Sequence, residues 1–184
     1  KTILITGSAG SIGSEIVRQV ARFEPKLIIV LDQSETALFD IKNEIKQTFE
    51  NVRFVPFLAD IRNLERMEYV VKTYRPDIIY HAAAYKHVPM LEDNPVEAVQ
   101  TNVLGTKNMA DLAVKYKVSK FVMISTDKAV NPANIMGASK RIAEIYVQSY
   151  FKKLQREGNV ITNFITTRFG NVLGVFDADK NLDL

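Results

Sequence analysis

The apolar and polar positions of the chain alternate between two kinds of segment. Short runs rich in Ile, Val and Leu, bounded by turn residues, predict strands, and stretches in which apolar residues recur every three or four positions predict helices. The expected strands are Thr2–Thr6, Leu27–Leu31, Val52–Phe57, Ile78–His81, Lys120–Ser125 and Ile161–Arg168. The expected helices are Ser11–Phe23, Glu35–Phe49, Leu64–Tyr74, Pro95–Tyr116 and Ile135–Glu157.

The order of these segments predicts the fold class. The strands show no clean apolar–polar alternation, which is typical of strands that helices cover on both faces of a sheet. Strand and helix alternate through residues 1–174, so we predict one α/β domain there, a doubly wound parallel sheet of the Rossmann type. Residues 175–184 are polar, and no element is predicted for them.

Composition narrows the class of protein further. The 184 residues are 47% hydrophobic and 24% charged, as in soluble globular proteins. There is no cysteine, so disulfides and thiolate metal sites are excluded, and with only two histidines no metal site is expected. The net charge of +3 comes from lysines that are spread along the chain, which favours a phosphate-bearing small ligand over nucleic acid.

No apolar run approaches the roughly 20 residues that span a bilayer, so we expect no membrane contact by this segment. The chain opens directly on a predicted strand without an initiator methionine. We interpret it as part of a longer protein, and we expect the segment to be cytoplasmic.

A glycine-rich loop follows the first predicted strand. The sequence "ITGSAGSIGSE" spaces three glycines as Gly-x-x-Gly-x-x-Gly at the start of a helix. Glycine allows a tight turn and lets backbone N–H groups approach a pyrophosphate at the helix N-terminus. The loop residues expected to bind a dinucleotide are Gly7, Ser8, Gly10, Ser11, Ile12 and Gly13.

Further candidates stand at the ends of the next strands, on the sheet edge where ligands bind in this architecture. Asp32 is placed to accept hydrogen bonds from the adenosine ribose, which favours NAD over NADP because a 2′-phosphate would meet a negative charge; its alternative role is to cap the next helix. Asp60 and Ile61 are placed to contact adenine, and Ala82 to Ala84 give the dinucleotide a small-residue surface. For the two nearby histidines, His81 and His87, we favour packing or hydrogen bonding over catalysis.

Four segments together resemble the extended short-chain dehydrogenase/reductase superfamily. They are "TGSAGSIGSE", "AAAYKHVPMLEDNPVEAVQTNVLGT", "STDKAVNPANIMGASKRIAE" and "TTRFGNVLG". Within it, the chain is most similar to the UDP-N-acetylglucosamine 4,6-dehydratases of bacterial polysaccharide biosynthesis. The resemblance implies a Rossmann fold, bound NAD and a UDP-sugar substrate, with a homo-oligomer left open. Larger relatives carry membrane helices, so we expect a parent protein attached to the inner membrane.

The position of the usual catalytic tyrosine is occupied by methionine. Met136 stands four residues before Lys140, one helical turn away, and both are expected at the cofactor, where Lys140 would hold the nicotinamide ribose. A literal Tyr-x-x-x-Lys does occur at Tyr116 and Lys120, but it falls at the opposite edge of the predicted sheet and is not interpreted as the site. Methionine transfers no proton, so another group must take the proton of the sugar 4-hydroxyl.

The resemblance points to Thr126, Asp127 and Lys128, which follow directly on the fifth strand. It implies that hydride leaves sugar carbon 4 for NAD, that neutral Lys128 removes the carbon 5 proton, and that protonated Asp127 donates to the departing 6-hydroxyl. The simpler alternative is an exposed Asp127–Lys128 ion pair beside a turn threonine. Lys86 is expected to contact cofactor and substrate, and Asn102 and Asn171 to support the substrate site.

Two other functions stay open. A nucleotide-sugar 4-epimerase on the same fold would usually need the missing tyrosine, and carbon 5 deprotonation explains Asp127 and Lys128 better. A catalytically silent dinucleotide-binding module would fit both Met136 and the tail "GVFDADKNLDL", which departs from the dehydratase pattern where the substrate-covering region is expected.

Overall fold

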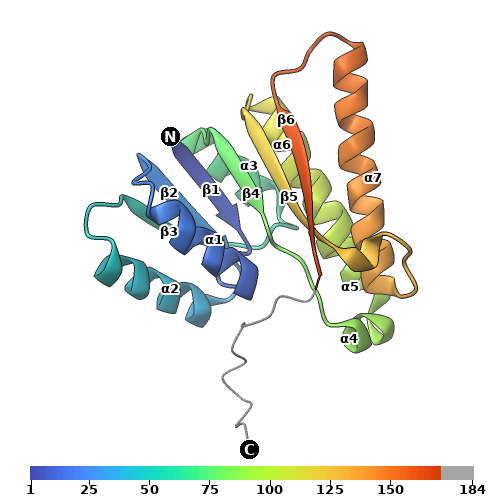
Figure 1. Cartoon of the computed structure of the whole chain (residues 1–184), viewed down its shortest axis with the longest axis horizontal. Helices are drawn as coiled ribbons and strands as arrows, with labels where there is room; N and C mark the ends of the chain where they lie inside the picture. The colour runs from blue at the N-terminus through green and yellow to red at the C-terminus, as the bar shows by residue number, and fades with distance from the viewer. Residues whose placement is uncertain (171–184) are drawn as a thin grey trace, which may run out of the picture.

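The structure, a computed structural model, describes residues 1–170 and has the predicted doubly wound sheet (Figure 1). Its strands are parallel in the order β3-β2-β1-β4-β5-β6, so the winding direction changes between β1 and β4. The strands are β1 (Thr2–Thr6), β2 (Leu27–Asp32), β3 (Phe54–Leu58), β4 (Ile78–His81), β5 (Lys120–Thr126) and β6 (Asn163–Phe169).

Helices pack on both faces of the sheet, as the uninterrupted apolar strands predict. On one face α1 and α2 cover a core that includes Ile5, Val17 and Ile28; on the other, α3, α6 and α7 cover a core around Leu4 and Phe121 (Figure 1). The helices are α1 (Ser11–Ala21), α2 (Glu35–Thr48), α3 (Leu64–Tyr74), α4 (Val88–Asp93), α5 (Pro95–Ala98), the π-helix η1 (Val99–Gly105), α6 (Thr106–Lys115), the 3₁₀ turn η2 (Asp127–Ala129) and α7 (Ile135–Arg156).

Several elements differ from the sequence prediction. The helix expected at Pro95–Tyr116 runs as α5, η1 and α6, with a π-helical middle that changes which side chains face inward. The short helix α4 was not predicted, because six residues are too few to show a helical period. The third and sixth strands begin two residues later than expected, at Phe54 and Asn163.

The topology brings the ends of β1 to β5 to one sheet edge, where the predicted site residues follow. Tyr116 and Lys120 lie at the other edge: the Tyr116 hydroxyl donates to Glu68 at 2.6 Å, and Lys120 is the first residue of β5. This Tyr-x-x-x-Lys is therefore not part of the site. Among residues 1–170, no helix has both the length and the apolar character needed to cross a bilayer.

Candidate dinucleotide and reaction site

The glycine-rich turn packs directly against the loop after β4. Gly7 has φ +68°, and a Cβ built on it would lie 2.5 Å from the backbone nitrogen of Ala83. A Cβ on Gly13, in the first turn of α1, would lie 1.9 Å from the Gly7 carbonyl oxygen. Only glycine fits at these two positions, so the backbone forms a close cradle at the N-terminus of α1, which suits a pyrophosphate.

A cavity of about 300 Å³ opens beside this turn. Residues from the ends of β1, β2, β3 and β4 line it, together with one residue of η1. The lining residues are Gly7, Ala9, Gly10, Asp32, Gln33, Ser34, Ala37, Ala59, Asp60, Ile61, Ala82, Ala83, Ala84, Tyr85 and Thr101. The predicted glycines, carboxylates and alanines thus meet around one space, although Ser8, Ser11, Ile12 and Gly13 are not part of its lining.

Asp32 joins the end of β2 to the glycine-rich turn. One carboxylate oxygen accepts from the Ala9 N–H at 3.0 Å, and the other accepts from the Ser34 N–H at 3.0 Å. Ser34 is the N-cap of helix α2, so Asp32 bonds to the residue that precedes the helix and not to an N–H group of its first turn. The carboxylate lies at the cavity wall, where it can also meet the hydroxyls of a ribose.

The second carboxylate of the cavity, Asp60, is paired with Arg62. The Arg62 side chain lies 2.6 Å from it, and the Arg62 N–H donates to it at 2.8 Å. Burial alone would raise the pKa of Asp60, but these bonds hold it below its usual value, so the carboxyl is ionised. Ile61 is buried against Gly105 of η1, where an added Cβ would lie 2.5 Å from its Cδ1.

Several lining residues were not predicted from the sequence, among them Gln33, Tyr85 and Thr101. Gln33 donates to the Tyr85 hydroxyl at 3.2 Å, which links the ends of β2 and β4 across the cavity. Thr101 is 5% exposed, and its hydroxyl has no hydrogen-bond partner among residues 1–170. A buried hydroxyl without a partner at a cavity wall suits a polar ligand atom. Gln33 follows Asp32 directly, a signal that could have been used, whereas Thr101 is placed by the π-helix.

Asn102 is completely buried and supports the loop after β4. Its amide accepts from the Tyr85 N–H at 2.8 Å and donates to the Tyr85 carbonyl at 3.1 Å and to Ser139 at 2.9 Å. Both amide hydrogens are therefore used within the protein, which gives Asn102 a supporting place beneath the loop. Lys86, the next residue of that loop, is exposed and lines an adjacent cavity of about 380 Å³ with His87.

His81 has the hydrogen-bonded, buried place that we favoured. Its ring bonds to Thr6 at 2.8 Å and to Thr106 at 3.0 Å. The Thr106 hydroxyl donates to the Asn102 carbonyl, so it accepts from the Nε2–H of a neutral histidine. Burial, with a smaller effect of Lys140, lowers the pKa of His81 to about 3. His81 is therefore neutral, and its two hydrogen bonds and its burial fix the end of β4 in the core.

The two residues of the altered Tyr-x-x-x-Lys motif lie in different surroundings. Met136 is buried in a small cluster with Leu91 and Ala98 of α4 and α5, and it is not part of the described cavity lining. Lys140 is buried and donates from Nζ to the Ile124 carbonyl of β5 at 2.7 Å. Burial lowers the pKa of Lys140 to about 8, so at neutral pH it remains a cation.

Thr126, Asp127 and Lys128 come together at the end of β5. The Thr126 hydroxyl donates to Asp127 at 2.9 Å, and the Lys128 ammonium lies 3.5 Å from the same carboxylate oxygen. The Thr126 hydrogen bond and the charge of Lys128 lower the pKa of Asp127, so it is ionised at neutral pH. The structure thus contains the ion pair that was considered as the simpler alternative, with both side chains about half exposed.

Helix α7 and strand β6 enclose this turn from two sides. A Cβ on Gly137 would lie 2.4 Å from the Lys128 carbonyl oxygen, so glycine lets α7 begin directly against the turn. A Cβ on Gly170 would lie 3.6 Å from the Asp127 carboxylate, which places the end of β6 beside that group. Asn171 and residues 175–184 lie outside the described residues.

Comparison with known proteins relates this arrangement to nucleotide-sugar enzymes. The polysaccharide biosynthesis protein family model matches residues 3–176. The chain is 54% identical, over 95% of its length, to 28% of the capsular polysaccharide biosynthesis protein CapD of Staphylococcus aureus. It is 35% identical, again over 95% of its length, to 50% of a UDP-N-acetylglucosamine 4,6-dehydratase (inverting) of Campylobacter jejuni. The chain therefore spans half or less of these two relatives.

Solved structures share the fold. Pen from Bacillus thuringiensis aligns with a TM-score of 0.85 at 37% identity, covering 95% of this chain and 51% of that one. A UDP-glucose 4-epimerase of Thermus thermophilus in complex with NAD aligns with a TM-score of 0.75 at 28% identity, covering 91% and 54%. The relatives thus include a dehydratase and an epimerase, and the epimerase structure contains NAD.

Proposed function

Because the chain belongs to the polysaccharide biosynthesis protein family of extended short-chain dehydrogenases/reductases, we propose that it is the core of a nucleotide-sugar 4,6-dehydratase. The proposed substrate is UDP-N-acetylglucosamine, which would be converted to a 4-keto-6-deoxy sugar for glycan biosynthesis. The observation that carries the proposal is the Thr126–Asp127–Lys128 cluster at the end of β5, combined with a methionine where the tyrosine acid/base would stand.

The cavity fits a dinucleotide by two features of this structure. Glycines at positions 7 and 13 leave the close backbone approach that a pyrophosphate needs, and Thr101 presents a buried hydroxyl without a partner within residues 1–170. NAD, when bound, would accept hydride from sugar carbon 4 and return it to carbon 6. Asp32 would bind the adenosine ribose, and Lys140 the nicotinamide ribose after giving up its bond to Ile124.

The Asp127–Lys128 pair holds the number of protons that the elimination step needs, whereas the proton released from the 4-hydroxyl during oxidation at carbon 4 would pass to another group, because Met136 cannot accept it. Elimination requires a neutral lysine to take the carbon 5 proton and a protonated carboxyl to release the 6-hydroxyl. The structure has the charged form of the same pair, with nitrogen and oxygen 3.5 Å apart. Moving one proton from Lys128 to Asp127 gives the reactive form without uptake from solvent, and exclusion of water by bound substrate would favour that neutral form.

The residues around this pair agree with elimination. Met136 transfers no proton, and its burial with Leu91 and Ala98 fits a packing role. Thr126 donates to Asp127 and is placed to orient it toward the substrate. Lys86, on the exposed loop after β4, is placed to meet the diphosphate or sugar.

A second candidate function is nucleotide-sugar 4-epimerisation, which the likeness to the UDP-glucose 4-epimerase favours. The Thr126–Asp127–Lys128 cluster argues against it, because 4-epimerisation requires no removal of the carbon 5 proton. Met136 does not separate the two functions, since both begin with oxidation at carbon 4 and need a proton acceptor there. A silent dinucleotide-binding module is the third possibility. We propose that the parent works in the cytoplasm, where NAD and UDP-sugars are available, and that it is attached to the inner membrane.

Mass spectrometry of UDP-N-acetylglucosamine incubated with the full-length parent and NAD separates these functions. A dehydratase gives a product that has lost one water, and the parent should form it. An epimerase gives a product of unchanged mass and a different sugar, which sugar analysis would detect. Recovery of unchanged substrate, with NAD bound, would identify the silent module and contradict the proposal.

A further inference from the structure

Glu144 is a fully buried carboxylate that the proposed reaction does not use. It lies on α7 one helical turn after Lys140, with 0% of its side chain exposed. Arg168 of β6 binds it with two nitrogens, at 2.9 and 2.7 Å, and Arg141 approaches it at 3.2 Å. Burial alone would raise the pKa of Glu144, but the two arginines hold it below its usual value, so Glu144 is a buried anion.

Positive side chains lie on helix α7 and on elements packed against it. Arg141 lies beside Lys140 on α7, Arg168 faces the same helix from β6, and Lys128 lies on the turn that α7 packs against. The other titratable groups are His81 of β4, which is neutral, and Asp127, which is engaged by Thr126 and Lys128. Burial disfavours the charged form of Lys140, whereas Glu144 favours it. Glu144 is therefore the buried negative charge next to the cofactor lysine.

The same carboxylate ties β6 to α7. In the β5–β6 register Arg168 lies opposite Ser125, and Phe169 lies opposite Thr126. Arg168 is therefore close to the end of β6, two residues before Gly170. Gly170 in turn lies next to the Asp127 carboxylate. A double hydrogen bond from Arg168 to a rigid buried partner thus fixes the end of β6 where it borders the reaction cluster.

We propose that Glu144 is a positioning residue that keeps Lys140 a cation at neutral pH and, through Arg168, holds the end of β6 beside Asp127. The inference rests on the proposed function in one respect, namely that Lys140 binds the cofactor. Glu144 itself touches neither cavity lining nor reaction cluster in the described residues, so it acts through Lys140 and Arg168.

The first test compares Glu144→Gln with wild type in the full-length protein, by calorimetry of NAD binding from pH 6 to 9.5. Wild-type affinity should fall as pH rises through about 8, where Lys140 loses its proton. In Glu144→Gln the fall should begin about one pH unit lower, which corresponds to an affinity loss of about threefold near pH 7.5, approaching about tenfold above pH 8.5, and little loss at pH 6.

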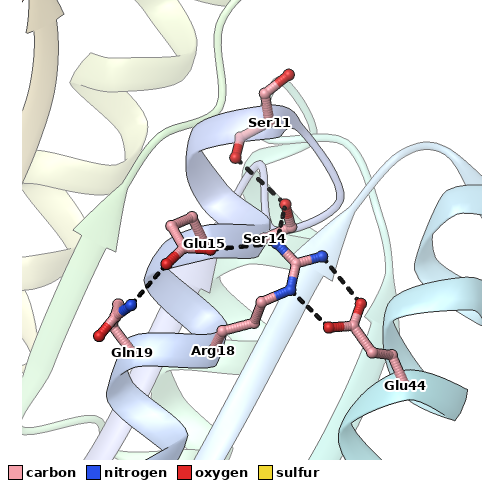
Figure 2. A network of polar contacts seen from close by, with 6 residues as sticks. All are labelled: Ser11, Ser14, Glu15, Arg18, Gln19 and Glu44. Carbon is pink, nitrogen blue, oxygen red and sulfur yellow. Dashed lines mark hydrogen bonds and ion pairs between the residues drawn. The ribbon is translucent and has the colours of Figure 1, made fainter. Parts of the chain in front are cut away.

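The chain offers a matched control on the other side of the sheet. Arg18 binds Glu44 with two nitrogens at 2.5 and 2.9 Å and bridges α1 to α2, as Figure 2 shows. Glu44→Gln makes the same chemical change in an ion pair of the same geometry, away from Lys140. It should lower the melting temperature slightly and leave the pH profile of NAD binding unchanged.

A second measurement does not depend on NAD or on activity. The pKa of Lys140 can be followed by NMR of ¹³Cε-labelled lysine, assigned with Lys140→Arg. It should fall in Glu144→Gln and rise in Arg168→Gln, because the second substitution removes a positive neighbour. Since Arg168 is more than one-third exposed, that variant provides a test even if Glu144→Gln does not fold.

The outcomes separate this inference from the function it rests on. If the pKa of Lys140 stays the same in the folded variants, Glu144 is only a structural clamp and the inference is wrong, whatever the enzyme catalyses. If that pKa moves but NAD binding is independent of pH in all proteins, Lys140 does not hold the cofactor, and both its proposed role and the positioning role fail. Both shifts together support the inference.

Discussion

The two halves of the sheet form their parts of the site in different ways. In the half made by β1, β2 and β3, backbone and glycine create a close cradle, and Asp32 and Asp60 are already held by N–H groups or Arg62. In the half made by β5 and β6, Asp127 and Lys128 are about half exposed and form an ion pair that is not the reactive form. The proposed cofactor half is thus preformed, whereas under our proposal the reaction half would be completed by substrate and the rest of the protein.

This difference has a physical reason. A dinucleotide is bound through its phosphates and ribose, and fixed N–H groups and carboxylates do this best when they need no rearrangement. A lysine that must become neutral needs an environment that excludes water, which bound substrate can supply. The chain spans 28% and 50% of the two sequence relatives described above, and we propose that in the parent further segments cover this half of the site.

The largest effect is expected in the reaction half. Lys128→Ala should lower dehydration of UDP-N-acetylglucosamine by the full-length protein about 10²–10⁴-fold, the usual contribution of a general base. NAD affinity should stay within about twofold of wild type, because Asp32, Lys140 and the glycine-rich turn hold the cofactor. Product formation and NAD calorimetry measure the two effects separately. A variant that still dehydrates at nearly the wild-type rate would rule out Lys128 as the base.

A comparable test breaks the cofactor half alone. Gly7→Ala should weaken NAD binding roughly 5- to 150-fold, because its Cβ would meet the Ala83 nitrogen at 2.5 Å and overpacking costs about 1–3 kcal/mol. Gly158→Ala is the matched control: its φ is +67°, against +68° at Gly7, but nothing lies within 4 Å of the added Cβ. Calorimetry should show normal NAD affinity for the control. Equal losses in the two variants would mean that backbone strain, not the cradle, is responsible.

The preference for NAD or NADP tests whether the Asp32 carboxylate determines which dinucleotide binds. Wild-type protein should bind NAD at least about tenfold more tightly than NADP, because the 2′-phosphate would meet the Asp32 carboxylate and about 1.4 kcal/mol of repulsion suffices. Asp32→Asn should reduce the difference between the affinities for NAD and NADP. Tighter binding of NADP by the wild-type protein would contradict the assignment.

The smallest effect on catalysis is expected at Met136. Met136→Ala removes packing against Leu91 and Ala98, and we expect a stability loss of about 2–5 kcal/mol with activity reduced far less than in Lys128→Ala. Thermal unfolding and product formation at low temperature check this. If Met136→Ala lowered the rate of product formation more than Lys128→Ala does, the reaction would be centred on α7 and not on the end of β5.

The fold was predictable because turn residues mark its elements clearly. The expected bounds of β1, β4 and α3 match the structure, since an Asn63 cap and short apolar runs define them. The π-helix η1 was not predictable, because one wide turn leaves the apolar pattern of Pro95–Tyr116 almost unchanged. That turn places Thr101 at the cavity and buries Asn102.

The site was predictable where it depends on topology. Parallel strands bring their ends to one edge, so the positions of Gly7, Asp32, Asp60 and Ala83 followed from the strand order. Contacts between distant side chains could not be predicted, because they depend on helix rotation and rotamer. The bond from Gln33 to Tyr85 and the burial of Glu144 between two arginines are of this kind.

The account depends most on Lys128 removing the proton from sugar carbon 5. The direct measurement is the reaction of the full-length protein with UDP-N-acetylglucosamine in heavy water, followed by NMR and mass spectrometry of the product. We expect wild-type product that has lost one water and carries deuterium at carbon 5, and we expect neither change with Lys128→Ala. An epimer of unchanged mass, or deuterium at carbon 5 in the Lys128→Ala reaction, would contradict the account.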